Sequence, residues 1–122
     1  MSMQIETTAK VEKGTSASGT PLTVIRFSGD ISSNSKEAVL GTYQKLPKDV
    51  NKQILLDFSK SEYLNSSGIA LVIQIMMEAS KSGQTIHVFG LTAHFQKVFK
   101  MVGITKYATV HESETAAKAA VA

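Results

Sequence analysis

The feature that most constrains the fold is an alternation of apolar patterns between residues 53 and 90. The segment QILLDF, residues 53–58, is short and apolar at nearly consecutive positions, as expected for a strand covered on both faces. A helical pattern follows over residues 67–82, and QTIHVFG, residues 84–90, indicates another strand. Such a crossover joins parallel strands. The sequence therefore predicts an α/β or mixed α+β class, with residues 53–58 in the middle of the sheet.

Small polar residues and glycines mark the ends of the predicted helices. Gly83 follows helix 67–82 at the position where a left-handed C-cap is favoured. Ser113 is expected to cap a last helix, after a short strand in TKYATV. Thr92 is expected to cap a helix that Gly103 ends, with apolar residues at helical spacing: Phe95, Val98, Phe99 and Val102.

The N-terminal part of the chain predicts further strands and one more helix. We expect an edge strand over residues 3–10, a polar loop over residues 14–20, and a strand rich in β-branched and aromatic side chains over residues 22–28. In SSNSKEAVLGTYQKL, Asn34 is expected to cap a helix, with Glu37 three residues further on.

Composition places the chain among small globular proteins and narrows what it can bind. Its 122 residues are 43% hydrophobic and 19% charged, which suits one domain over residues 1–122. The net charge is only +3 and the thirteen Lys and Arg are scattered, so we expect no nucleic-acid partner. Without cysteine, a signal-peptide pattern or an apolar run of about 18 residues, a cytoplasmic protein with no membrane span is expected.

Catalytic and cofactor patterns are missing from the sequence. It contains neither G-x-G-x-x-G nor a Walker A motif, and His87, His94 and His111 lack the spacing of local metal motifs. Ser66, His87 and Asp57 are the residue types of a hydrolase triad, but the G-x-S-x-G motif is absent. We therefore expect no catalytic residue, no metal and no cofactor.

The stretch YLNSSGIALVIQ, residues 63–74, is the candidate functional motif. It places Asn65, Ser66 and Ser67 before Gly68, where a helix is expected to begin. One interpretation is a helix cap, for which Asn65 or Ser66 alone suffices. The other is a phosphoacceptor, because the free N–H groups and the dipole at a helix N-terminus stabilise a phosphate. Local chemistry favours the cap and leaves the second interpretation open.

Two apolar residues extend this motif along the predicted helix. The polar stripe of the helix consists of Gln74, Glu78 and Lys81, and Ala70 and Met77 fall beside it. Apolar surface next to a loop hydroxyl is suited to meeting a protein partner. For either residue taken singly, ordinary partial exposure is the simpler alternative.

The order of these elements resembles the STAS domain of bacterial anti-sigma factor antagonists, over about residues 22–117. LTVIRFSGDIS is similar to the first long strand and G-E-L-D turn of that family, and ILLDFSKSEYLNSSGIALVI to its strand, loop and D-S-[ST]-G motif. FGLTAHFQKVFKMVGITKYATVHESETAA is similar to its last strand, helix and ending. The resemblance implies a STAS-like fold, a four- to five-stranded, mostly parallel mixed sheet flanked by about four helices.

The resemblance also implies a function based on binding. In this family the protein docks on an anti-sigma factor that is a histidine-kinase-like serine kinase, and so frees a sigma factor. Phosphorylation of the motif's first serine, here Ser66, ends this contact. A phosphatase restores the contact by removing the phosphate. Asn65 and Ser32 stand where the family has aspartates. A monomer or weak dimer is expected. The partner-facing residues that we expect are Asp30, Ser32, Asn65, Ser67, Gly68, Ala70 and Met77.

Two other functions remain open at this point. The chain could be a STAS scaffold or transporter-associated module that binds proteins without being phosphorylated. It could also be a small enzyme or nucleotide-binding domain that uses the same edge of the sheet.

Overall fold

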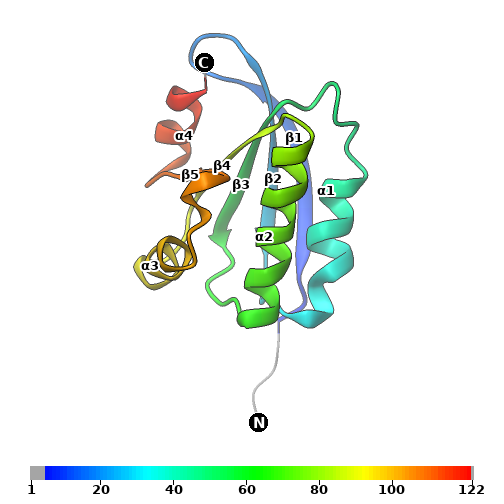
Figure 1. Cartoon of the computed structure of the whole chain (residues 1–122), viewed down its shortest axis with the longest axis vertical. Helices are drawn as coiled ribbons and strands as arrows, with labels where there is room; N and C mark the ends of the chain where they lie inside the picture. Colours follow the sequence, from blue (N-terminus) through cyan, green and yellow to red (C-terminus); the bar gives the residue numbers. More distant parts are fainter. Residues whose placement is uncertain (1–4, 122) are drawn as a thin grey trace.

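Five strands form one mixed sheet in the computed structural model, which describes residues 5–121. Strand β1 is antiparallel to β2, whereas β2, β3, β4 and β5 are parallel to one another. In sheet order the strands are β1 (Thr8–Thr15), β2 (Pro21–Ser28), β3 (Gln53–Lys60), β4 (Thr85–Phe89) and β5 (Ala108–Val110). The strand predicted for the middle of the sheet is thus confirmed there (Figure 1).

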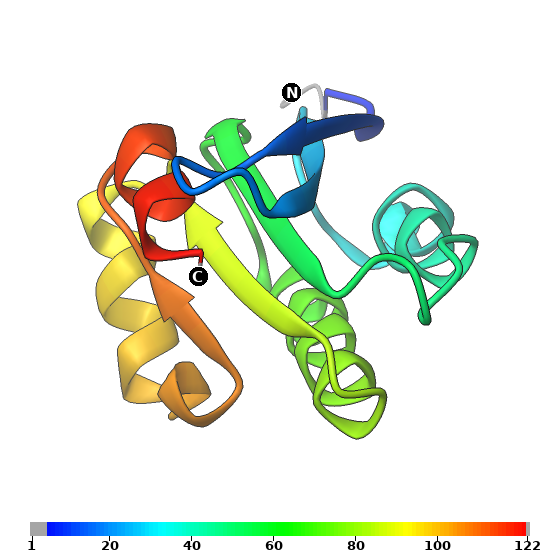
Figure 2. The ribbon, with the colours of Figure 1, turned by 90° about the horizontal axis from the view of Figure 1, so that it is seen from above.

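Helices cover both faces of the sheet. Figures 1 and 2 place α1 and α2 on one face and α4 on the opposite face, with α3 beside β5. Within residues 5–121 no helix is both long and apolar enough to cross a membrane. The α-helices are α1 (Thr42–Gln44), α2 (Ser66–Lys81), α3 (Ala93–Met101) and α4 (Glu114–Ala120).

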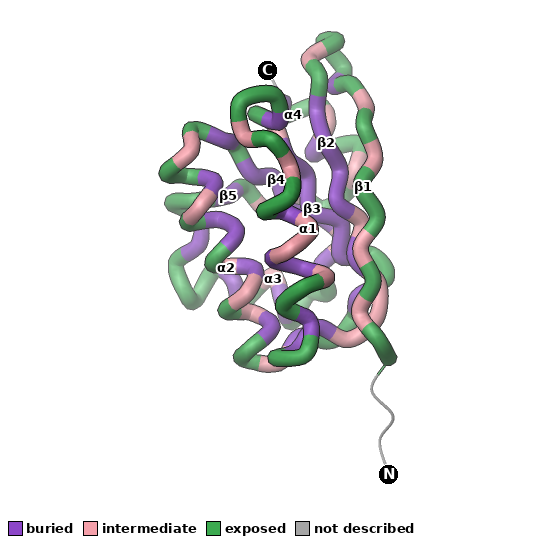
Figure 3. Tube along the Cα trace, turned by 90° about the vertical axis from the view of Figure 1, so that its right-hand side faces the viewer, coloured by how far each residue is buried: buried purple, intermediate pink, exposed green. Residues whose placement is uncertain are grey.

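Two apolar clusters fill the space between these layers, and Figure 3 shows the buried strands between more exposed helices. Residues 54–58 of β3 are all buried, because side chains on both sides of this strand meet a covered face. The larger cluster joins the sheet to α1, α2 and α3. The smaller one lies under α4 and consists of Leu22, Val24, Leu55, Phe89, Ala117 and Val121.

The expected edge strand over residues 3–10 is displaced along the chain. Strand β1 begins at Thr8 and continues to Thr15, and residues 3 and 4 lie outside the described part. The polar loop is correspondingly shorter than residues 14–20, because Gly14 and Thr15 pair with Leu22 and Pro21 across the hairpin. Local composition marked the turn, but the pairing with β2 decided where the strand ends.

The expected cap at Asn34 is wrong, and the predicted helix is divided into short pieces. A 3₁₀ turn (Ser33–Ser35) and a π turn (Glu37–Gly41) precede α1. The cap is Ser32, whose hydroxyl accepts a hydrogen bond from the Asn34 N–H at 3.3 Å, while the Ser35 hydroxyl accepts one from the Ser32 N–H at 2.9 Å. Two serines three residues apart therefore form the capping box that we expected from Asn34 and Glu37.

The other predicted helix ends are confirmed. The side chains of Thr92 and Ser113 cap α3 and α4, accepting hydrogen bonds from N–H groups three residues further on at 3.3 Å and 3.1 Å. Gly83 and Gly103 follow α2 and α3 with left-handed φ of 71° and 78°. Val102, expected on the buried side of α3, is instead 53% exposed, because α3 ends one residue before it.

Candidate protein-docking site at the start of α2

Two loops lie side by side at the edge of the sheet where β2 and β3 end. The Ile31 N–H donates to the Tyr63 carbonyl at 3.0 Å, and the Ile31 carbonyl accepts from the Asn65 N–H at 3.1 Å. Ile31 and Leu64 form a parallel bridge, and both side chains are buried. This pairing brings the turn after β2 next to the motif before α2, as required for a common binding surface.

Asn65 is the residue that caps α2. Its Oδ1 accepts a hydrogen bond from the Gly68 N–H at 2.9 Å, and its carbonyl accepts one from the Ile69 N–H at 2.9 Å. The choice that the sequence left open between Asn65 and Ser66 is thereby resolved. Capping therefore does not use the Ser66 hydroxyl.

Ser66 and Ser67 are the first two residues of α2, and both are exposed. Among residues 5–121, neither hydroxyl has a hydrogen-bond partner. N–H groups in the first turn of a helix lack helical acceptors and lie at the positive end of the helix dipole. An anionic group on Ser66 would therefore be favourably placed.

Gly68 is buried where the two loops meet. A Cβ at this position would lie 2.2 Å from the Ile31 carbonyl oxygen and 2.9 Å from its Cγ2. Because the nearest atom is backbone, a larger residue would displace the turn after β2. The glycine thus permits the close approach that holds the site together.

The exposed face of α2 carries no charge over its first three turns. Met77 on this face is 43% exposed, and the first charged residue that is exposed is Lys81. Glu78, expected in the solvent stripe, is partly buried and accepts a hydrogen bond from Gln44 Nε2 at 3.2 Å. The exposed residues before Lys81 are Ser66, Ser67, Ala70, Gln74, Met77 and Ser80. We call this set the uncharged face of α2.

The expected partner-facing residues differ in exposure. Ser67, Ala70 and Met77 are exposed, and Asp30 and Asn65 are half-buried. The Asp30 carboxylate accepts a hydrogen bond from the Ile5 N–H at 3.1 Å. Ser32 and Gly68 are buried, so these two shape the loops from within.

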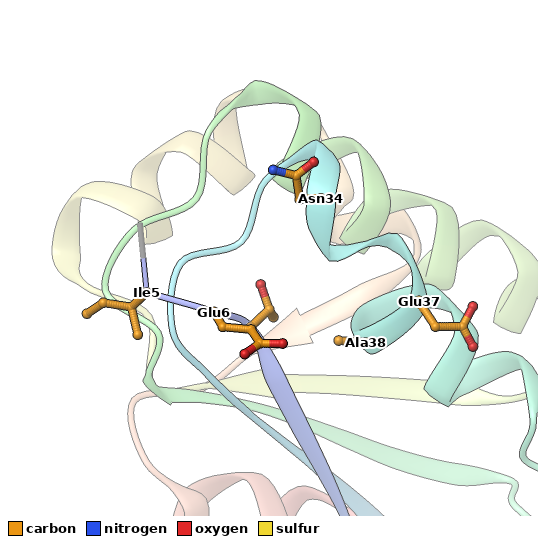
Figure 4. A pocket seen from close by; sticks show the side chains of 6 residues that line it. Ile5, Glu6, Asn34, Glu37 and Ala38 are labelled. Atoms are coloured by element: carbon orange, nitrogen blue, oxygen red, sulfur yellow. The ribbon is translucent and has the colours of Figure 1, made fainter. Parts of the chain in front are cut away.

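Sequence reasoning missed two exposed apolar residues near the motif. Tyr63, two residues before the cap, is 54% exposed, and Ile5 beside Asp30 is 65% exposed. In the sequence, Tyr63 could have been recognised as an aromatic residue within a polar loop. Close by lies a depression of about 460 Å³ (Figure 4), lined by Ile5, Glu6, Thr7, Asn34, Glu37 and Ala38.

The structure does not bring Ser66, His87 and Asp57 together as a catalytic triad. Asp57 accepts a hydrogen bond from Arg26 Nη1 at 2.8 Å and from the Ser59 hydroxyl at 2.6 Å. His87 contacts His111 instead of either triad partner. Within the described chain, no three His, Asp or Glu side chains are grouped in a way that could hold a metal ion.

The five-stranded mixed sheet, with a serine-bearing helix directly after its central strand, defines the class as a STAS-type domain. Residues 17–111 match the family described as "Mlab, STAS domain", and the chain belongs to this family. No curated protein matches the chain in sequence.

Solved structures share this fold at low sequence identity. An anti-sigma factor antagonist from Mycobacterium paratuberculosis has a TM-score of 0.78 at 19% identity, with 95% of this chain and 94% of that one covered. Unphosphorylated SpoIIAA, an anti-sigma factor antagonist, has a TM-score of 0.65 at 18% identity, covering 86% and 88%. The murine anion transporter Slc26a9 has a TM-score of 0.67 at 11% identity, covering 93% of this chain and 21% of the transporter. At these identities the similarity concerns the fold.

Proposed function

We propose that this chain is a cytoplasmic, non-enzymatic STAS regulator, an anti-sigma factor antagonist that docks through the start of α2 and is switched off by phosphorylation of Ser66. The observation that carries the proposal is the exposed Ser66 hydroxyl, which Asn65 leaves free by capping the helix. The uncharged face of α2 continues from this hydroxyl and supplies neutral contact surface.

Phosphorylation of Ser66 would change the charge of this surface without unfolding it. A phosphate adds a charge of about −1.5 to −2 at neutral pH. The N-terminus of α2 tolerates that charge, and Asn65 caps the helix without adding a carboxylate beside it. In the complex the same charge would be desolvated against the partner, which weakens binding. The proposed partners are an anti-sigma factor with serine kinase activity and a phosphatase that removes the phosphate.

The experiment is a kinase and binding assay on the intact chain. The protein is incubated with ATP and serine kinases from its own genome, and the modified residue is mapped by mass spectrometry. Ser66→Asp should weaken binding to the kinase that modifies the chain at least tenfold, which corresponds to about 1.4 kcal/mol of binding free energy. Ser18→Asp is the matched control, because it adds the same charge on the exposed turn between β1 and β2, and it should bind normally. Phosphate on other residues only would contradict the proposal.

A transporter-associated module is the second candidate function. The fold shared with the murine anion transporter Slc26a9 supports it. In that case the uncharged face of α2 would bind a transporter subunit and Ser66 would not be modified. Identification of the proteins that co-purify with the chain separates the two: a histidine-kinase-like ATPase supports the first function, and a transporter subunit supports the second.

A further inference from the structure

Two histidines from different segments meet on the face of the sheet that α4 covers. His87 Nδ1 on β4 lies 2.9 Å from His111 Nε2, in the segment that joins β5 to α4. His87 is 5% exposed and pairs in register with Leu55, a member of the cluster under α4. The second ring nitrogen of His87, Nε2, is buried and has no hydrogen-bond partner among residues 5–121.

The neutral pair is compatible with this geometry. If His87 Nδ1–H donates to His111 Nε2, the other hydrogen of the pair lies on His111 Nδ1. His87 Nε2 then carries only a lone pair, and no buried N–H is left without an acceptor.

Adding a single proton to the pair makes it incompatible with this buried geometry. If the bond between the rings is kept, both outer nitrogens must carry hydrogen, whichever ring holds the charge. The buried His87 Nε2–H then has no acceptor, and a charge is desolvated. Two added protons place N–H groups on both facing nitrogens and remove the bond altogether. Consistently, burial lowers the pKa of both imidazoles, and proximity to His111 lowers the pKa of His87 further.

Charged groups on the surrounding elements pair with one another and do not offset a positive charge on either imidazole. Arg26 on β2 bonds Glu12 on β1, Asp57 on β3 and Glu114 on α4, and Lys118 on α4 pairs with Glu114. None of these side chains forms a hydrogen bond or ion pair with either imidazole in the described structure. His111 is therefore the ionisable partner of His87.

The position of His111 connects the pair to α4. Only two residues separate it from Glu114, and Ser113 between them is the cap of α4. This helix has seven residues, too few to be stable alone, and it is held by Ala117, Val121 and the Arg26–Glu114 pair. A displacement of His111 from His87 therefore removes one of the anchors of α4.

We propose that the His87–His111 pair is an acid-sensitive latch, in which protonation separates the two rings and releases α4 from the sheet. Because the released state binds protons more readily, release is favoured as the pH falls below the ordinary histidine range near 6.5. Glu114 stays ionised in this window, since hydrogen bonds from Arg26 and Lys118 lower its pKa to about 2. The ion pair alone therefore would not produce the response.

Methyl NMR of the intact chain tests the latch from about pH 7.5 to about pH 5. The Ala117 and Val121 methyl signals report α4, and the Ala79 methyl in the larger cluster is the reference. We expect the α4 signals to move toward random-coil positions at low pH while the Ala79 signal stays. The opening equilibrium should rise by up to about tenfold per pH unit for each proton bound.

Variants and a direct titration complete the test. His111→Gln should weaken the pH response, and His94→Gln, on the exposed surface of α3, should leave it unchanged. In the wild type, the imidazole signals of His87 and His111 should titrate below the ordinary histidine range near 6.5. The latch is overturned if His87 titrates within the ordinary histidine range near 6.5. It is also overturned if the Ala117 and Ala79 signals move at the same pH, which would indicate unfolding of the whole chain.

Discussion

The carbonyl oxygen of Ile31 occupies the space that a side chain on residue 68 would need, with only 2.2 Å between it and the position of a Cβ on Gly68. The same carbonyl accepts the hydrogen bond of the Asn65 N–H. One backbone group thus fixes both the start of α2 and its distance from the turn after β2. The Ser66 hydroxyl owes its position to this contact.

Gly68→Ala should therefore destabilise the fold and displace the site. Because the clash is with backbone, we expect a loss of about 2–3 kcal/mol in the free energy of unfolding, measured by urea denaturation. Gly14→Ala is the matched control, since its Cβ would meet only the Leu22 side chain at 3.5 Å. Equal stability of the two variants would show that the turn moves freely.

Asn65 should be replaceable by aspartate but not by alanine. Aspartate keeps an oxygen that can accept the Gly68 N–H, whereas Asn65→Ala removes the cap and should cost about 1 kcal/mol. Thermal unfolding of the two variants beside the wild type measures the difference. A destabilised Asn65→Asp would indicate that the cap depends on the amide group.

Glu114 should contribute to stability at neutral pH and lose this contribution in acid. Its pKa is lowered to about 2 in the folded state, so the stabilisation is present above the unfolded pKa near 4.5 and is lost as the pH falls toward 2. The carboxylate is partly exposed, so Glu114→Gln should cost only about 1 kcal/mol at pH 7. Urea unfolding at neutral and acid pH measures this, with exposed Glu112→Gln as control.

Tyr43 should stabilise the contact between α1 and the chain entering β4. The ring is fully buried, and its hydroxyl donates a hydrogen bond to Gln84 Oε1. Burial, with a contribution from Glu78, raises the pKa of Tyr43 to about 12, so the phenol remains a donor at neutral pH. Tyr43→Phe should cost about 1–2 kcal/mol by leaving Gln84 Oε1 unpaired. The more exposed Tyr107→Phe should change stability by less than about 0.5 kcal/mol.

Local signals in the sequence predicted most elements of this fold. The apolar run at residues 53–58 indicated the central strand, and Thr92, Ser113 and Gly83 marked helix ends that the structure confirms. These features depend on interactions between residues one to four positions apart. The NSSG motif, residues 65–68, was located in the same way, and α2 begins within it at Ser66.

Where several residues suit the same role, the sequence alone does not show which of them is used. Ser32, Asn34 and Ser35 can all form caps, and the capping box uses the two serines. Asn65 and Ser66 were equally suitable caps for α2, and Asn65 is used. Small differences in backbone geometry select among such residues, and these differences are set by the packed surroundings.

By itself, the sequence determined the order of strands and helices, the central strand and the serine-bearing start of α2, because periodicity and capping act over one or two turns. Only the tertiary structure decided the contact of Gly68 with Ile31, the meeting of His87 with His111 and the joining of β2, β3 and α4 by Arg26. The residues of each contact lie at least 24 positions apart, and no local pattern records which of many distant partners a residue will meet. Their contacts arise when parallel pairing aligns β2, β3, β4 and β5 and α4 closes over the sheet.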